Sequence, residues 1–141
     1  MKAEELMIGD WVYNTHNRQR ERVAEIGSGL VMLDYNDLYE YDEIEPIPIT
    51  GEILVQNGLR KVEVPGEKGM QTYYIDPHIA GYYNMSPLER LHRSCIVYDP
   101  ASKWAFFNSE ESRVEIFCGT VNKFQHGLKL AGLSMDLKLE P

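Results

Sequence analysis

The chain has 141 residues, of which 43% are apolar and 26% charged, and its formal net charge is -8. This composition predicts a folded protein with a hydrophobic core, and the excess of acids argues against general binding to phosphate backbones. No apolar run approaches the roughly 20 residues that cross a bilayer, and the first residues form no signal peptide. Two cysteines cannot build a disulfide framework, so we expect a cytoplasmic protein without membrane contact.

The negative charge is concentrated in one part of the chain. Residues 1–50 hold 11 Asp and Glu against 4 Lys and Arg, a net of -7, whereas residues 51–141 hold 11 against 10. The change falls in the segment 44–59, which we call the joint. We therefore predict an acidic N-terminal unit over residues 1–46 and a second unit over residues 47–141.

Short β-rich segments separated by turns fill the N-terminal unit. Segments 6–13, 22–26, 30–35 and 38–44 predict strands, and polar residues 14–20 predict a loop. Strands this short bury their apolar side chains most economically by closing on themselves. The sequence therefore predicts a small barrel of the Src-homology type.

The joint carries stop and start signals. Pro46 and Pro48 cannot donate ladder hydrogen bonds, and Thr50 has the side chain of a helix N-cap. Gly58 suits the left-handed position after a helix over residues 50–57, in a Schellman ending that brings Leu59 back to Leu54. The same Leu-x-x-x-Gly-Leu pattern recurs over residues 128–133.

The second unit reads as a mostly antiparallel sheet with one packed C-terminal helix. Segments 61–64 and 71–75 predict a hairpin, Ser86-Pro87 predicts one or two helical turns, and further strands follow between residues 94 and 117. Apolar residues recurring along one stripe predict a helix over residues 120–131. Alternation over residues 134–139 predicts a final strand, so the fold class is α+β and β-rich.

Three motifs carry a resemblance to a known group of proteins. They are Leu-x-Ile-Gly-Asp-Trp-Val at 6–12, Ile-x-Pro-Ile-Pro-Ile-Thr-x-Glu-Ile-Leu-x-x-Asn-Gly at 44–58, and Val-Asn-Lys-Phe-Gln-His-Gly-Leu-Lys-Leu-Ala-Gly at 121–132. The chain resembles a family of small uncharacterised proteins of gut anaerobic bacteria and their phages and mobile elements. It departs from that family at Asn122 and Phe124. The resemblance implies no activity or cofactor, and favours a small accessory protein of a mobile element.

An acidic, tyrosine-rich run is the first candidate site. Its carboxylates could imitate a phosphate backbone and its tyrosines could contact a protein partner. The ordinary alternative is a strand whose tyrosines pack on the core while its acids face water. The candidate partner-binding residues are Tyr35, Asp37, Tyr39, Glu40, Tyr41 and Asp42.

An arginine-rich loop is the second candidate. Arg18, Arg20 and Arg22 could touch nucleic acid from a hairpin tip. A plain exposed loop is the alternative, because the surrounding charge is negative.

The remaining reactive side chains form no recognisable site. His92, Cys95, Cys118 and His126 match no zinc spacing, and both cysteines lie among apolar strand neighbours, which predicts buried thiols. No nucleophile elbow or phosphate loop is present. We expect Trp11 and Trp104 in the cores and His126 on the polar side of its helix, and we assign no catalytic residue, metal or cofactor.

The sequence thus favours a non-enzymatic protein-interaction module of a phage or mobile element, with an unknown protein partner. The acidic face or a groove beside the joint would bind that partner. The alternatives are a nucleic-acid-associated factor using the Arg18–Arg22 loop, and an acidic DNA mimic that binds a DNA-binding protein.

Overall fold

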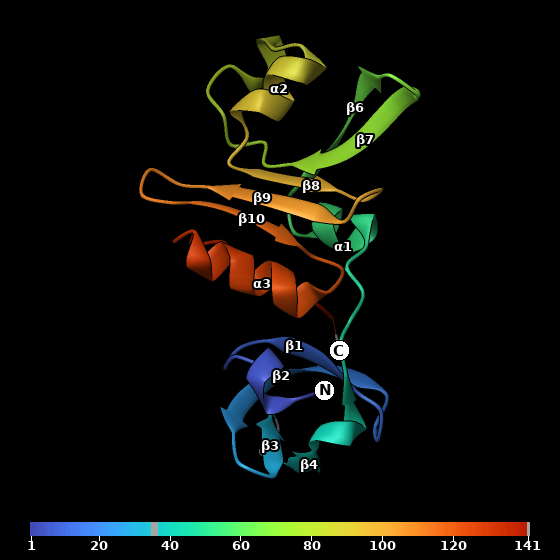
Figure 1. Cartoon of the computed structure of the whole chain (residues 1–141), viewed down its shortest axis with the longest axis vertical. Helices are drawn as coiled ribbons and strands as arrows, with labels where there is room; N and C mark the ends of the chain where they lie inside the picture. The colour runs from blue at the N-terminus through green and yellow to red at the C-terminus, as the bar shows by residue number, and fades with distance from the viewer. Residues whose placement is uncertain (35–36, 141) are drawn as a thin grey trace.

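The N-terminal unit is an open antiparallel sheet. The structure is a computed structural model that describes residues 1–34 and 37–140, and its first sheet has the order β4-β3-β2-β1-β5 (Figure 1). Its elements are η1 (Ala3–Glu5), β1 (Trp11–Asn14), β2 (Gln19–Ile26), β3 (Leu30–Leu33), β4 (Leu38–Glu40), η2 (Tyr41–Glu43) and β5 (Ile44–Glu45). A register shift between Val23 and Glu25 bends β2, which pairs with β1 along one part and with β3 along another.

The predicted closed barrel is not confirmed. In the described residues β4 and β5 are the two edges of the sheet, joined by η2 and not paired with each other. The strands nevertheless curl around a small core of their own, made of Leu6, Val12, Val23, Val31, Leu33, Tyr39 and Ile44.

The second unit contains a five-stranded antiparallel sheet in the order β10-β9-β8-β7-β6. Its strands are β6 (Arg60–Gly66), β7 (Gly69–Ile75), β8 (Ile96–Asp99), β9 (Trp104–Asn108) and β10 (Arg113–Phe117). The helices are α1 (Gly51–Gln56), η3 (Tyr82–Asn84), α2 (Pro87–Arg93) and α3 (Val121–Leu130). The α+β, strand-rich class is confirmed, and no helix among the described residues is long and apolar enough to span a bilayer.

Helices cover both faces of this sheet, whereas the sequence predicted one helix on one face. Alternate residues of β7 and β8 face opposite ways: Tyr74 and Tyr98 pack with α1 and α3, while Ile75 and Val97 pack toward η3 and α2. The apolar stripe predicted for α3 is confirmed, since Phe124 lies edge-on to Phe107 with ring centroids 4.9 Å apart.

The capping signals of the joint are confirmed. The Thr50 hydroxyl accepts a hydrogen bond from the Ile53 N–H, and Gly58 has φ +93°. The N–H of Leu59 donates to the Leu54 carbonyl at 3.0 Å. The same bond joins Leu133 to Leu128 after α3, so both helices end in the Schellman motif.

The predicted final strand over residues 134–139 does not form. The C-terminal segment, residues 133–140, has no regular secondary structure, although Leu137 and Leu139 are buried. Side chains replace a strand partner: the Asn57 amide pairs with the N–H and C=O of Lys138, and the Trp11 indole donates to the Leu137 carbonyl at 2.9 Å. The alternation in sequence therefore reflects alternate burial without a ladder.

Candidate functional site

The two described tyrosines of the acidic run, Tyr39 and Tyr41, pack inward. Tyr39 is buried in the N-terminal core, and Tyr41 is half-buried, with its hydroxyl donating to the Gly27 carbonyl at 2.6 Å. Tyr35 lies outside the described residues. The ring of Tyr39 therefore belongs to the core, as the ordinary alternative expected.

The acids of the same run face solvent. Asp37, Glu40 and Asp42 are exposed. One carboxylate oxygen from each of Glu40, Asp42 and Glu43 lies within 4.8 Å of the others, the one such cluster of possible metal ligands among the described residues. Exposed carboxylates are well hydrated, so this proximity by itself marks negative potential and no built cation site.

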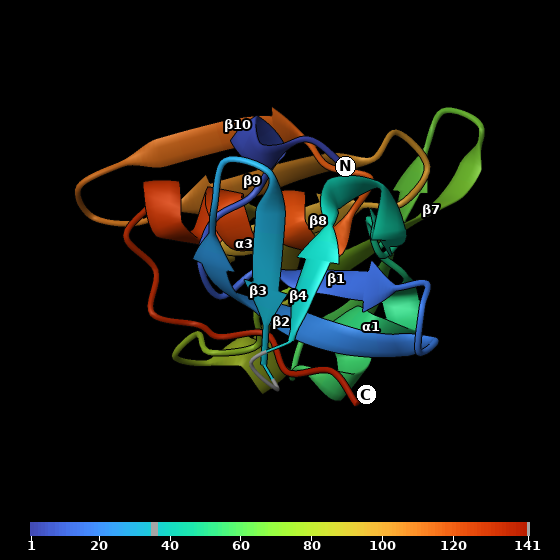
Figure 2. The same cartoon turned by 90° about the horizontal axis from the view of Figure 1, so that it is seen from below.

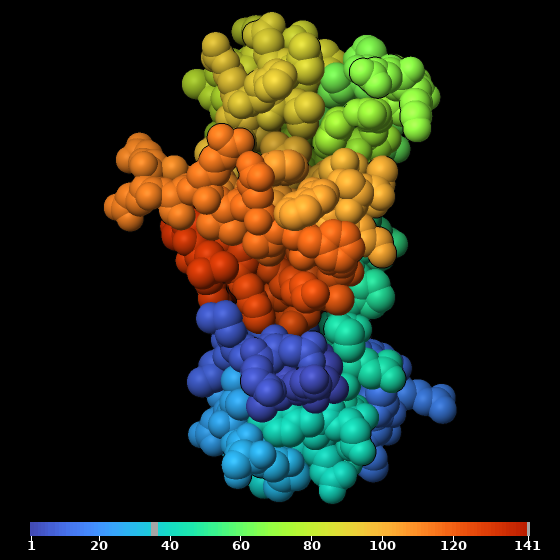
Figure 3. Space-filling model, in the orientation of Figure 1, coloured from blue at the N-terminus to red at the C-terminus, as the bar shows by residue number. Residues whose placement is uncertain are grey.

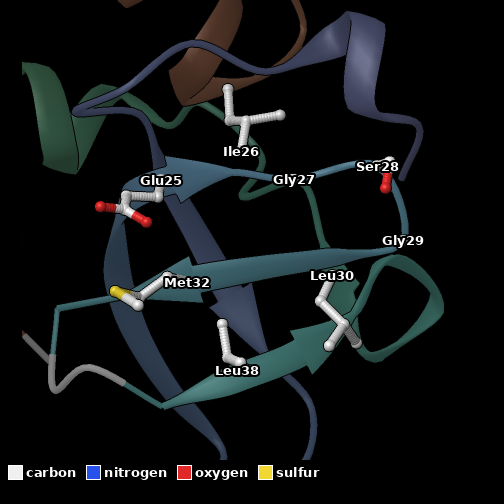
Figure 4. A pocket seen from close by; sticks show the side chains of 8 residues that line it. All are labelled: Glu25, Ile26, Gly27, Ser28, Gly29, Leu30, Met32 and Leu38. Atoms are coloured by element: carbon white, nitrogen blue, oxygen red, sulfur yellow. The ribbon is translucent and has the colours of Figure 1, made fainter.

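An apolar hollow opens beside these acids, and sequence reasoning missed it. Its volume is about 440 Å³, and the turn between β2 and β3 forms one wall (Figure 4). Three of its apolar side chains are well exposed: Ile26 at 36%, Leu30 at 42% and Leu38 at 56%. The full lining is Glu25, Ile26, Gly27, Ser28, Gly29, Leu30, Met32 and Leu38.

Strand register explains why the hollow faces solvent. On β3, Val31 and Leu33 fill the core, so Leu30 and Met32 point outward. Met32 pairs with Leu38, and Leu30 pairs with Glu40, which places a carboxylate on the same face as the apolar side chains. The hollow lies at the end of the molecule farthest from the second sheet, and Figure 2 looks onto β3 and β4 there.

The arginine candidates are not equivalent. Arg18 is exposed at the tip of the β1–β2 turn and Arg20 is half-buried. The guanidinium of Arg22 lies 4.9 Å from the Trp11 ring centroid, donates to both Asp136 carboxylate oxygens at 3.0 Å, and donates to the Leu137 carbonyl. Arg22 therefore holds the C-terminal segment and is not part of an open nucleic-acid surface.

A polar seam joins the two units. On α3 the polar side chains at spacing i, i+3, i+4 and i+7 reach residues 5–11, and Figure 3 shows the narrow waist where the units meet. Gln125 accepts from the Trp11 N–H at 2.9 Å and donates to the Gly9 carbonyl at 3.0 Å. Asn122 and Lys129 donate to the carbonyls of Glu5 and Ile8.

A buried acid lies within this seam. The Asp10 carboxylate is fully buried, and its Oδ2 lies 2.6 Å from Nε2 of His126. The Met7 N–H also donates to Oδ2, whereas Oδ1 has no partner among residues 1–34 and 37–140. His126 is thus on the polar side of its helix, as predicted, but it faces the other unit. No signal in one sequence pairs residues 116 positions apart.

The cysteines occupy opposite environments. Cys118 is buried, and desolvation raises the pKa of its thiol to about 12. Burial likewise raises the pKa of Tyr98, whose hydroxyl donates to the Cys118 carbonyl, to about 12. Cys95 is exposed, against expectation, in a groove of about 360 Å³ beside the joint that also contains Asp76 and His78.

Of the two tryptophans expected in the cores, one is buried and the other is not. Trp11 is buried, whereas Trp104 is 43% exposed on the outer face of β9.

The chain matches no protein-family model, no curated protein and no solved structure. The resemblance drawn from sequence therefore stays a prediction, and function has to be inferred from the surface itself.

Proposed function

We propose that the N-terminal unit is a protein-binding module whose site is the apolar hollow with its acidic rim. Its partner offers an extended segment in which apolar side chains alternate with Lys or Arg. The observation that carries this proposal is the exposure of Ile26, Leu30 and Leu38 together in one hollow. Clustered exposed apolar side chains with a polar rim are typical of interaction sites, whereas isolated ones are ordinary.

The backbone beside the hollow supports an extended ligand. The Leu33 N–H donates to the Asp37 carbonyl, and by alternation Tyr39 directs its backbone groups toward β3. The backbone N–H and C=O groups of Leu38 and Glu40 therefore point to the open edge of the sheet. An added strand would gain main-chain hydrogen bonds there and place alternate side chains in the hollow.

Charge supports the basic character of the ligand. Glu25 lines the hollow, and Glu40 shares its outward face. The exposed Asp37 and Asp42 flank β4 in the chain. Because residues 1–50 carry a net charge of -7, the surface would attract cationic segments and repel acidic ones.

Selection from a library of random displayed peptides tests the proposal. We expect enriched peptides to alternate apolar and basic residues, and synthetic copies to bind more weakly as salt rises. Leu38→Ser should weaken binding about tenfold or more, since it removes an apolar anchor from the hollow. Val55→Ser is the matched control, because Val55 is 51% exposed on α1, outside this surface. Enriched peptides that bind the Leu38→Ser variant as tightly as the native protein would overturn the proposal.

Two further sets of variants, compared with Leu38→Ser, separate the alternatives. A DNA mimic should lose its basic partner when Asp37, Glu40 and Asp42 become amides, and should keep it in Leu38→Ser. A nucleic-acid factor should shift labelled DNA or RNA and lose this in the double variant Arg18→Ala, Arg20→Ala. From its residues and the resemblance, we also propose that the protein is a non-enzymatic, cytoplasmic accessory factor of a phage or mobile element.

A further inference from the structure

The edge strand β10 has unused hydrogen-bonding groups. It lies at one edge of the second sheet and, within residues 1–34 and 37–140, pairs only with β9. The Cys118 N–H donates to the Lys103 carbonyl and the Ser109 N–H donates to the Ser112 carbonyl, which fixes the alternation along the ladder. Residues 113, 115 and 117 therefore direct their N–H and C=O groups away from β9. No group among residues 1–34 and 37–140 bonds to those outward groups.

The side chains around this edge are also exposed. Phe117 is 55% exposed and packs edge-on against the exposed Trp104 at a centroid distance of 6.3 Å. Arg113 and Glu115 are exposed on the same face, with an ion pair of 3.2 Å between them. β10 contains no proline, whereas Pro65 removes a donor from β6, the opposite edge of the sheet.

We propose that β10 pairs with β10 of a second copy of this chain, in an antiparallel register centred on Val114. This pairing would join the two five-stranded sheets across a two-fold axis. The proposal is independent of the apolar hollow, which lies in the other unit.

The charges on β10 select that register. Centring on Val114 places Arg113 opposite Glu115 of the partner subunit, and the symmetry axis repeats this ion pair. Centring on Glu115 would instead oppose two identical carboxylates. Both registers use the outward backbone groups, so the side chains decide between them. In the favoured register Arg113 of the partner subunit lies diagonal to Phe117, within reach of its ring.

The interface is small, so we expect a weak dimer, half-formed at about 10–100 µM. Sedimentation of the whole protein from low micromolar to millimolar concentration measures this equilibrium. Arg113→Glu alone or Glu115→Arg alone should weaken the dimer about tenfold or more, because each change turns both ion pairs into repulsions. An equimolar mixture of the two variants should associate, since both cross-pairs are then opposite in charge.

The controls use the other edge of the same sheet. Lys61 and Glu63 form an exposed ion pair on β6 with the same spacing, so Lys61→Glu and Glu63→Arg should leave the dimer unchanged. Unchanged circular dichroism would show that every variant folds. Three results would overturn the proposal: a native protein that is monomeric at every concentration, a dimer whose dissociation constant is unchanged by Arg113→Glu and by Glu115→Arg, or a mixture of these two variants that stays monomeric.

Discussion

Replacing Gln125 with alanine tests whether the polar seam holds the N-terminal unit against α3. The Gln125 side chain is 6% exposed and satisfies the Trp11 N–H and the Gly9 carbonyl. Without Gln125 the buried Trp11 N–H loses its acceptor, and an unpartnered buried amide destabilises the folded state by about 1–3 kcal/mol. The Gly9 carbonyl also loses its donor, at a smaller free-energy cost because this hydrogen bond is only partly buried. We expect a loss of about 2–3 kcal/mol in the free energy of unfolding, or about 6–10 °C in Tm for a chain of this size.

Urea unfolding monitored by tryptophan fluorescence measures this loss, because Trp11 lies in the seam. Lys123→Ala is the matched control: Lys123 is exposed on the same helix and should change stability by less than about 0.5 kcal/mol. A Gln125→Ala variant within about 0.5 kcal/mol of the native protein would refute the reasoning. It would mean that water replaces both hydrogen bonds and that the seam contributes little.

Three further predictions follow from packing and titration. Gly127→Ala should destabilise by about 1–3 kcal/mol in thermal unfolding, since a Cβ there overlaps the ring of Phe107. Burial raises the pKa of the Cys118 thiol from 9.0 to about 12, so between these pH values only the unfolded chain loses the thiol proton. The contribution of the buried thiol to the free energy of unfolding should therefore be fully present below about pH 9 and fall toward pH 12. Cys118→Ala should remove the part of that loss between about pH 9 and pH 10, whereas the loss above pH 10 to which buried Tyr98 contributes should remain. A thiol reagent should label Cys95 alone until denaturant is added. Asn57→Ala should cost about 1–2 kcal/mol and speed proteolysis within residues 133–140.

Local signals in the sequence predicted local structure well. Thr50 and Gly58 fix the ends of α1 through contacts no more than a few residues away, and the strands of the second sheet follow from turns and alternation. The final strand failed for a related reason. Alternation reports burial on one side of an extended segment, and it cannot tell a ladder partner from side chains such as Asn57.

The candidate site was harder to predict because it depends on which face of a strand is buried. Tyr39 and Glu40 are neighbours in sequence, yet Tyr39 belongs to the core and Glu40 to the rim of the hollow. The hollow combines Ile26, Leu30 and Leu38 from three strands, and none of them is unusual alone. The side chains that pair with Asp10 and Arg22 are His126 and Asp136, more than 100 positions away and beyond any local pattern.

The anchoring of the C-terminal segment has a consequence for synthesis of the chain. The Trp11 indole and the Arg22 guanidinium donate to Leu137 and Asp136, which are synthesised 126 and 114 residues later. During synthesis the N-terminal unit therefore emerges from the ribosome long before its contacts with the C-terminal segment can form. During that interval the Trp11 ring and the Arg22 guanidinium lack these partners, and the nascent chain exposes a surface that the finished protein covers. Chaperones that bind nascent chains would meet the protein at this surface.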